Sequence, residues 1–289
     1  MSEVGEQLYQ AFNARVSSDY FNEVEELREK YESLKPFAET DLDGLQSYAE
    51  DFKVRFAYHS NSLEGSTLSL GDTALVLEGE FPPHRPDSNL RDVFAAKGCF
   101  EGCSYAVETI GEYPELTEEF IKDTHERTAL DCQPRTRGVY RMSPVYIKGS
   151  MTVPVEAFNV RECMADLVYQ FNNCPNDPLV KIAAFHVMFE RIHPFSDGNG
   201  RTGRNIMNAM LVSSGYPQIT IKLSAKGEYN SALEDWQVRS DPQAFLRIFK
   251  NAIVEEYKEQ IRIVEITREC VKKTLSKEKA KEKDKGIER

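Results

Sequence analysis

The stretch from His193 to Arg204 combines several side chains that phosphate chemistry uses. His193 is a candidate general base, because an imidazole titrates near neutral pH. Asp197 supplies a carboxylate, a hard oxygen ligand that suits Mg²⁺. Arg201 and Arg204 fall on the first turn of an expected helix, so both guanidinium groups can reach one polyphosphate. Together these residues predict phosphoryl or nucleotidyl transfer.

An apolar helical pattern precedes this stretch, at 179–192, and another follows it, at 206–212. The sequence therefore predicts a helix, a tight loop and a second helix. Gly198, Asn199 and Gly200 lie where the second helix begins. The first backbone N–H groups of a helix have no partner within it, and the helix dipole attracts anions there. We expect these backbone groups to form an anion site.

The same stretch resembles the signature of the Fic family, H-x-F-x-[D/E]-G-N-G-R-x-x-R, and matches every defined position. Gly200 stands where the Doc-type branch, which resembles a kinase in activity, carries a lysine. The resemblance is therefore to the branch that transfers AMP from ATP to a Ser, Thr or Tyr hydroxyl of a protein. It implies an all-α fold, a helical bundle with one small β-hairpin called the flap. It also implies ATP as the substrate and Mg²⁺, or alternatively Mn²⁺, bound by Asp197.

The resemblance also implies a role for each residue of the signature. His193 takes the proton of the target hydroxyl as that oxygen attacks the α-phosphorus, and pyrophosphate leaves in line. Residues 198–200 hold the phosphates through their backbone N–H groups, with Asn199 at the α-phosphate. Arg201 and Arg204 hold the β- and γ-phosphates. Positioning and charge stabilisation would then supply most of the catalysis.

A second motif lies upstream, near the end of a helical pattern that runs from Asp41 to Gly65. Ser60 and Glu64 are four residues apart, so both project from one side of the helix. The motif resembles the inhibitory motif of the Fic family, [S/T]-x-x-x-E-[G/N]. In that interpretation Glu64 pairs with Arg204 and prevents productive ATP binding until it is displaced. Alternatively, Glu64 is an exposed residue at a helix end.

Two short runs, 145–148 and 151–153, alternate as strands do and flank the pair Gly149-Ser150. They predict a β-hairpin with a two-residue turn. In the Fic family the corresponding hairpin is the flap, which holds the target as an added strand. We therefore expect the target protein, or this chain itself, near Ile147 to Val153. A small structural hairpin is the alternative.

The resemblance places an aromatic and a polar residue of a later helix in the adenine and ribose pocket. Tyr229, Asn230 and Gln237 are the candidates. The chain departs from the family after this helix, where Trp236 to Asp241 replaces a small-residue Gly-Asp stretch. Phosphate binding is therefore better supported than a preference for adenine. Outside this pocket, the sequence offers no partner for His125, which is interpreted as structural.

At 289 residues the chain can bury a large core, as one domain or as two small ones. The expected organisation is an N-terminal helical extension at 1–41, a Fic core at 42–250, and a C-terminal helix with a charged tail at 251–289. Within the core, the inhibitory helix is expected near 50–65 and the flap near 145–153.

Composition favours a soluble protein of the cytoplasm. A net charge of −11 argues against a nucleic-acid partner, which needs a basic face. The beginning of the sequence lacks the pattern of a signal peptide, and no apolar run approaches the ~20 residues that span a bilayer. Six cysteines without a framework spacing fit a reducing compartment. A homo-oligomer is compatible with this composition.

Several alternative functions remain open at this point. In one, Glu64 orients a water molecule and the enzyme removes AMP from a protein. In another, the chain is a non-catalytic nucleotide-binding regulatory protein held shut by Glu64. His193 and Asp197 argue against that interpretation, because a protein that only binds needs no base. A different nucleotide or a phosphocholine donor is a further enzymatic variant.

Overall fold

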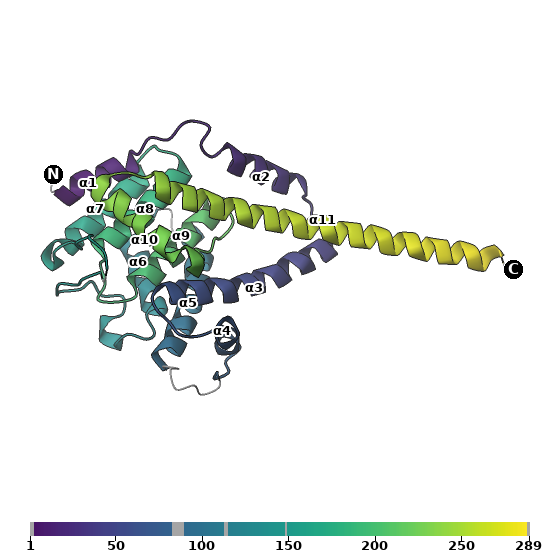
Figure 1. Ribbon diagram of the computed structural model, residues 1–289, viewed down its shortest axis with the longest axis horizontal. Coiled ribbons are helices and arrows are strands. Elements are labelled where there is room, and N and C mark those ends of the chain that lie inside the picture. The colour runs from purple at the N-terminus through teal and green to yellow at the C-terminus, as the bar shows by residue number, and fades with distance from the viewer. Residues whose placement is uncertain (1–2, 83–89, 113–114, 148, 288–289) are drawn as a thin grey trace.

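The computed structural model describes residues 3–82, 90–112, 115–147 and 149–287. Within these ranges every regular element is helical, which confirms the all-α fold (Figure 1). The α-helices are α1 (Glu3–Phe12), α2 (Asn22–Ser33), α3 (Glu39–Leu63), α4 (Leu70–Leu77), α5 (Leu90–Thr109), α6 (Glu118–Thr128), α7 (Val160–Asn173), α8 (Pro178–Ile192), α9 (Asn199–Ser213), α10 (Lys226–Arg239) and α11 (Gln243–Ile287). Short 3₁₀ turns lie at Ile110–Glu112, Pro134–Thr136, Ala157–Asn159 and Leu223–Ala225.

Helix α8 forms the centre of the body. Its side chains are apolar almost all round, and Phe185, Val187 and Phe189 are fully enclosed. Such a helix needs neighbours on every side, and α1, α7, α9, α10 and α11 supply them. Its start is fixed by Asp177, whose carboxylate accepts the N–H of Leu179 at 2.8 Å. The helix therefore delivers the residues at its C-terminal end to a defined place.

Helix α3 runs along the body and ends at Leu63, and the upstream motif lies at this C-terminal end. Phe52 and Phe56 of α3 pack with two buried cysteines of α5. On the other side, the hydroxyl of Tyr48 donates to Glu256 of α11 at 2.6 Å. The helix is thus held between α5 and α11, which fixes where Glu64 emerges (Figure 1).

Helix α11 continues without a break from the body into a projecting rod (Figure 1). Phe245, Phe249, Ile253 and Tyr257 of its first part are buried in the main core. The expected boundary at residue 250 falls inside this helix, so the Fic core and the C-terminal helix share one continuous element. Helix α1 also joins the core, because Leu8 and its neighbours are buried there.

The prediction of a β-hairpin is wrong in this structure, although Lys148 itself lies outside the described residues. The described residues of 145–153 include no strand, and the N–H of Ser150 donates to the carbonyl of Ile147 at 3.3 Å to close a turn. Other groups of this segment bond to α10 and do not form a strand ladder. The N–H of Met151 and the hydroxyl of Ser150 both donate to Glu234, at 2.8 and 2.9 Å. These contacts compete with the strand pairing that local alternation predicts.

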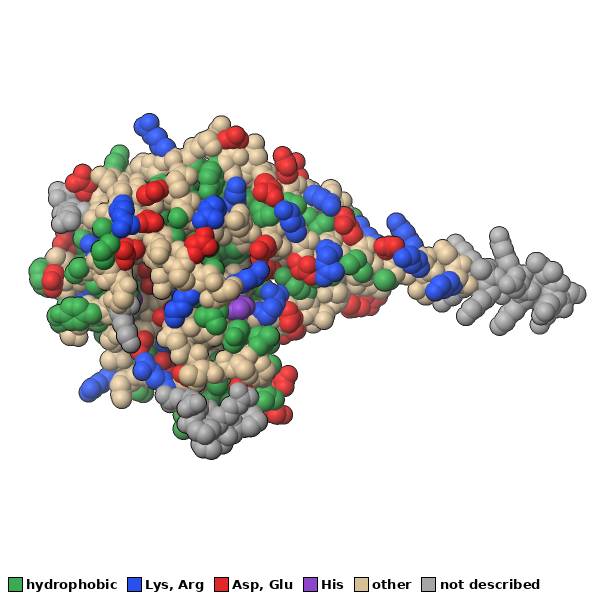
Figure 2. Space-filling model, viewed as in Figure 1, with side chains coloured by type: hydrophobic (Ala, Val, Ile, Leu, Met, Phe, Trp, Pro, Cys, Tyr) green, Lys and Arg blue, Asp and Glu red, His purple; other side chains and the backbone are tan. Residues whose placement is uncertain are grey.

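Acidic and basic side chains are interspersed over the face of the molecule seen in Figure 2. The whole chain carries 47 acidic residues against 36 basic ones, and many of them pair locally along helices. None of the described helices combines the length and the apolar character that crossing a lipid bilayer requires.

Candidate active site

The signature loop joins α8 to α9 and is closed by its own asparagine. His193 ends α8 with a left-handed backbone, at φ 51°, and its N–H donates to the carbonyl of Phe189. The side-chain amide of Asn199 accepts from the N–H of Phe195 at 2.8 Å and donates to its carbonyl at 2.9 Å. The oxygen and one N–H of this amide therefore hold the loop closed.

His125 of α6 lies beneath this loop and supports it. Its ring stacks on Phe195 with the ring centroids 3.6 Å apart. Its Nδ1 accepts from the N–H of Gly138 at 2.9 Å, so Nε2 carries the proton and donates to the carbonyl of Asp197 at 2.9 Å. Burial lowers the pKa of His125 to about 4, which keeps the ring neutral. The contact assigns to His125 a specific support for the loop, which the sequence did not reveal.

Arg204 contacts the upstream motif at the end of α3. Its Nε donates to the hydroxyl of Ser60 at 2.9 Å, and its Nη2 donates to the carbonyl of Ser60 at 2.8 Å. The same Nη2 donates to Glu64 Oε1 at 2.6 Å. Burial opposes ionisation of Glu64, but the charge of Arg204 prevails and lowers the pKa of this carboxyl. The end of α3 therefore holds Arg204 through its Nε and Nη2.

Gly200 gives the carboxylate of Glu64 its room. A Cβ atom at this position would lie 2.1 Å from Glu64 Oε1 and 3.1 Å from Nη1 of Arg204. Any side chain at residue 200 would therefore collide with the pair. The glycine thus has a steric reason in this chain, in addition to distinguishing it from the Doc-type branch.

Arg201 is paired with a residue that the sequence did not single out. Its Nη1 and Nη2 donate to the two carboxylate oxygens of Asp131, at 2.8 and 3.1 Å. The two side chains are only 4% and 3% exposed. Burial opposes ionisation of Asp131, yet the bonds from Arg201 keep its pKa below the ordinary value. No local pattern marks Asp131, because it lies in a turn after α6.

Asp197 also has a partner from another part of the chain. Its Oδ2 accepts from the guanidinium of Arg91, on the first turn of α5. Arg91 also reaches Asp131, with its Nε 3.3 Å from Oδ2 of that residue. Because Arg91 is 56% exposed and Asp197 is 46% exposed, their pair lies at the mouth of the site.

The acidic groups at this mouth fit a hard cation. Asp131, Cys132 and Asp197 each offer a ligand atom, and these atoms lie within 4.8 Å of one another. Burial raises the pKa of the Cys132 thiol to about 11, so it stays protonated and is a poor ligand for Mg²⁺. The two carboxylates supply the oxygen atoms that Mg²⁺ prefers, once their arginine partners give way.

His193 lies near Glu64 in a mostly enclosed position. Its Nδ1 is 3.3 Å from the carbonyl of Glu190, a geometry that leaves Nε2 free to accept a proton when Nδ1 carries the hydrogen. Burial lowers the pKa of His193, which favours the neutral, basic form at neutral pH. Burial also raises the pKa of Glu190 to about 8, so its carboxyl is mostly protonated at neutral pH.

The three candidates for the nucleoside pocket lie in different environments. Tyr229 is buried, and its hydroxyl is 2.7 Å from Nε2 of His186. Gln237 is buried as well and donates to the carbonyl of Val187 at 2.9 Å. Asn230 is exposed. Their role therefore stays a prediction.

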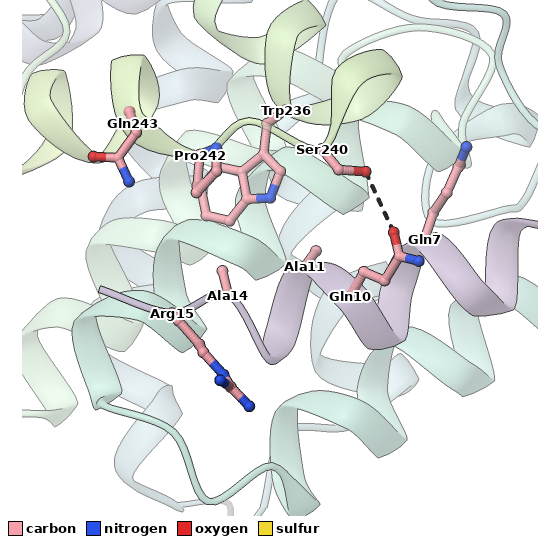
Figure 3. Close-up of a pocket in the computed structure, with 9 residues that line it drawn as sticks. All are labelled: Gln7, Gln10, Ala11, Ala14, Arg15, Trp236, Ser240, Pro242 and Gln243. Carbon is pink, nitrogen blue, oxygen red and sulfur yellow. Dashed lines mark hydrogen bonds between the residues drawn. The ribbon is translucent and has the colours of Figure 1, made fainter. Parts of the chain in front are cut away.

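A cavity of about 260 Å³ lies away from this chemistry, between α1 and the junction of α10 with α11 (Figure 3). Gln7, Gln10, Arg15 and Trp236 are among its lining residues, and Ser240 donates to Gln10 at 3.3 Å. It contains none of the signature residues. The signature side chains are instead covered by their partners from α3, α5 and the turn after α6.

The fold and this helix–loop–helix define a Fic-type domain. The model of the Fic/DOC family matches residues 115–211, which include the whole signature. This part of the chain therefore belongs to the Fic/DOC family. Glu64 and α10 lie outside the matched residues.

Known relatives agree with this assignment. Protein adenylyltransferase fic-1 of Caenorhabditis briggsae is 32% identical over 184 residues, which cover 62% of this chain and 35% of that protein. The protein of the same name from Caenorhabditis elegans is 29% identical over 216 residues, 73% of this chain and 41% of that protein. This chain thus spans well under half the length of either relative.

The fold is also that of a solved bacterial protein. A Fic domain containing signaling protein from Bacteroides thetaiotaomicron superposes with a TM-score of 0.75 at 27% identity. The match covers 84% of this chain and 97% of that one. It therefore extends to helices on either side of residues 115–211.

Proposed function

We propose that this chain is a protein adenylyltransferase held inactive by Glu64. The observation that carries the proposal is the engagement of Arg204 by Ser60 and Glu64 within a complete Fic signature. The names of the curated relatives support the transfer of AMP as the activity. The contacts of Arg204 support the inhibition.

The signature residues would act as follows once Arg204 is free. Neutral His193 takes the proton of a Ser, Thr or Tyr hydroxyl through Nε2. The hydroxyl oxygen forms a bond to the α-phosphorus of ATP, the bond from that phosphorus to the bridging oxygen breaks, and pyrophosphate leaves. The backbone N–H groups at the start of α9 receive the phosphate oxygens, because they have no partner within the helix. Arg201 and Arg204 balance the charge of the β- and γ-phosphates.

Asp197 and Asp131 would hold Mg²⁺, or Mn²⁺, at the mouth of the site. When bound, the ion supplies positive charge to the phosphate oxygens. Asp197 must first separate from Arg91, because one carboxylate oxygen cannot bind both the guanidinium and the metal ion at full strength.

Segment 145–153 is the proposed contact for a target protein. Tyr146, Met151 and Val153 are 88%, 63% and 67% exposed. The N–H groups of Ser150, Met151 and Thr152 are already bonded within the segment or to Glu234. The exposed apolar side chains are therefore the surface offered to a target. Self-modification remains part of this proposal, as does a location in the cytoplasm, which the free cysteines support.

Removal of AMP is the second candidate, and the exposure of Glu64 favours it. The side chain of Glu64 is 45% exposed, and Arg204 lowers the pKa of its carboxyl. An ionised carboxylate that faces both solvent and the signature can orient a water molecule toward a phosphorus atom.

The position of the label in ATP separates these activities. The Glu64→Gly variant should transfer label from ATP labelled at the α-phosphate and none from ATP labelled at the γ-phosphate. Label from the γ-phosphate alone would indicate a kinase and would overturn the proposal. Release of labelled AMP from a previously modified protein by the native chain, and not by Glu64→Gly, would establish the second candidate.

A further inference from the structure

The segment from Gly138 to Arg141 runs along the signature loop and contacts it at several places. Gly138 bonds to His125, which in turn bonds to the carbonyl of Asp197. The N–H of Arg141 donates to the carbonyl of Pro194 at 2.9 Å. The backbone of the loop is therefore supported from outside its own helices.

The side chain of Arg141 makes the central contacts of this segment. Its Nε donates to the carbonyl of His193 at 2.7 Å, and its Nη2 donates to the carbonyl of Ile192 at 3.2 Å. In the opposite direction, Nη1 donates to the carbonyl of Ser143 at 3.0 Å, and Nη2 also donates to the carbonyl of Val155. Arg141 is only 4% exposed, so water does not compete strongly for these bonds.

The bonds to Ile192 and His193 stabilise the end of α8. The last carbonyls of a helix have no partner within it, and the helix dipole makes that end negative, so a guanidinium is well placed there. His193 adopts a left-handed backbone, at φ 51°, which is uncommon for a residue with a side chain. Such a conformation persists when surrounding contacts hold it, and Arg141 supplies one through the carbonyl of His193.

We propose that Arg141 is a positioning residue that holds His193 for proton transfer and links it to the target-binding segment. This inference rests on the proposed function. Ser143 and Val155 flank residues 145–153, so one guanidinium bonds to the chain on both sides of the proposed target site and to the carbonyl of the proposed base. A shift of that segment on target binding would therefore reach His193 directly. ATP contacts lie on α9 and do not depend on Arg141.

The chain offers a matched control for the loss of such an arginine. Arg137 also donates to backbone carbonyls, those of Leu130 and Cys132, at 2.5 to 3.1 Å. None of these bonds involves His193 or residues 143–155. Arg137→Ala therefore reports the cost of losing carbonyl bonds in the same region without loss of the proposed positioning.

The activity test uses the Glu64→Gly chain with and without Arg141→Ala, Arg141→Lys or Arg137→Ala. Arg141→Ala should lower the initial rate of α-phosphate label transfer into lysate proteins by about 100-fold, because misplacing a catalytic group by an ångström costs that much. ATP affinity, measured by calorimetry, should stay within about twofold. Methylguanidine should restore part of the rate by filling the vacated site. Arg137→Ala should lower the rate of label transfer far less than Arg141→Ala does.

Parallel losses of rate and ATP affinity in Arg141→Ala would overturn the proposal. Equal losses of rate in Arg141→Ala and Arg137→Ala would also overturn it when ATP affinity is unchanged in both, a condition that excludes displacement of Asp131, which lies between the carbonyls that Arg137 holds. If Arg141→Ala does not fold, Arg141→Lys provides the test. We expect it to lower the rate of label transfer by about tenfold and to leave ATP affinity unchanged. An unchanged rate in Arg141→Lys would then contradict the positioning role.

A second readout needs no transfer reaction. NMR of a chain with labelled histidines should show the His193 imidazole signals, assigned through His193→Ala, shifted or broadened by Arg141→Lys and unchanged by Arg137→Ala. Unchanged signals in Arg141→Lys would overturn the proposal. Failure of Glu64→Gly to transfer any label would instead contradict the proposed function, and the NMR result would still decide on positioning.

Discussion

The carboxylate of Glu64 lies 2.6 Å from the guanidinium of Arg204, although 140 residues separate them in the sequence. Helix α3 ends at the start of α9, so the pair closes over Gly200 at the place where phosphates would bind. Arg201 and Asp197 are paired as well, with Asp131 and Arg91. Each ionic group that the transfer of AMP needs is thus already engaged.

Gly200→Ala should destabilise the chain through Glu64. The new Cβ would lie 2.1 Å from Glu64 Oε1, so the pair with Arg204 has to move. We expect a loss of about 1 kcal/mol in the free energy of unfolding by urea, because the atom that must move is the end of a half-exposed side chain and what is lost is its pair with Arg204. The same substitution in Glu64→Gly should cost clearly less, because the colliding carboxylate is gone. An equal loss of unfolding free energy in the native chain and in Glu64→Gly would contradict the contact between residue 200 and Glu64.

The contribution of Glu64 to stability should depend on pH. Arg204 outweighs burial and lowers the pKa of Glu64 in the folded state from 4.5. A lowered pKa stabilises the folded state above the unfolded pKa, and this contribution disappears as pH falls through the folded pKa. The native chain should therefore be more stable than Glu64→Gln at pH 7, by about 1 kcal/mol because the side chain is 45% exposed.

Unfolding measured by urea from pH 7 down to pH 3 tests this dependence. The difference between native and Glu64→Gln should be constant down to about pH 5 and shrink below it. A difference that grows as the pH falls would have the wrong sign and would exclude the ion pair as its cause.

Asp131→Asn should leave Arg201 buried without a counter-charge. The pair is almost fully enclosed, and breaking such a pair from one side costs about 3 kcal/mol. Phosphates of ATP can replace the lost carboxylate. We therefore expect ATP, added without a divalent cation because Asp131 is also a proposed Mg²⁺ ligand, to raise the melting temperature of Asp131→Asn more than that of the native chain. A smaller rise with ATP than in the native chain would show that Arg201 does not face the phosphates.

Arg91→Gln should make Asp197 easier for a cation to reach. Arg91 now bonds to the oxygen that Mg²⁺ would take, and both groups are about half exposed. Loss of such an exposed pair changes the free energy by about 1 kcal/mol, which corresponds to about a fivefold change in the affinity for the cation. Binding of Mn²⁺, followed by its EPR signal, should tighten by about that factor. Weaker binding would indicate that Arg91 helps to hold the site together.

Local patterns in the sequence predicted the helix–loop–helix and its two arginines. Apolar periodicity marks α8 and α9, and the residues between them are contiguous. The meeting of Glu64 with Arg204 was named in advance only because the upstream motif resembles a family pattern. Spacing alone could not bring residues of α3 to α9.

Contacts made by isolated residues could not be predicted from one sequence. Asp131, Arg91 and Arg141 lie in turns or at a helix start, and their partners are brought near by the packing of α5, α6 and α8. His125 was interpreted as structural, yet its position under Asp197 depends on Gly138. The hairpin prediction rests on two strand-like runs and the Gly149-Ser150 turn between them. Such local patterns carry no information about the competing bonds to Glu234.

The most direct measurement is the transfer of label from ATP, labelled at the α-phosphate, with Mg²⁺ present. The native chain, Glu64→Gly, and Glu64→Gly with His193→Ala would each be incubated with a cell lysate and by themselves. We predict strong labelling by Glu64→Gly, faint labelling by the native chain and none by the double variant. Equal labelling by the native chain and Glu64→Gly would contradict the inhibition. Absence of label in all three, with ATP still bound, would contradict the transferase itself.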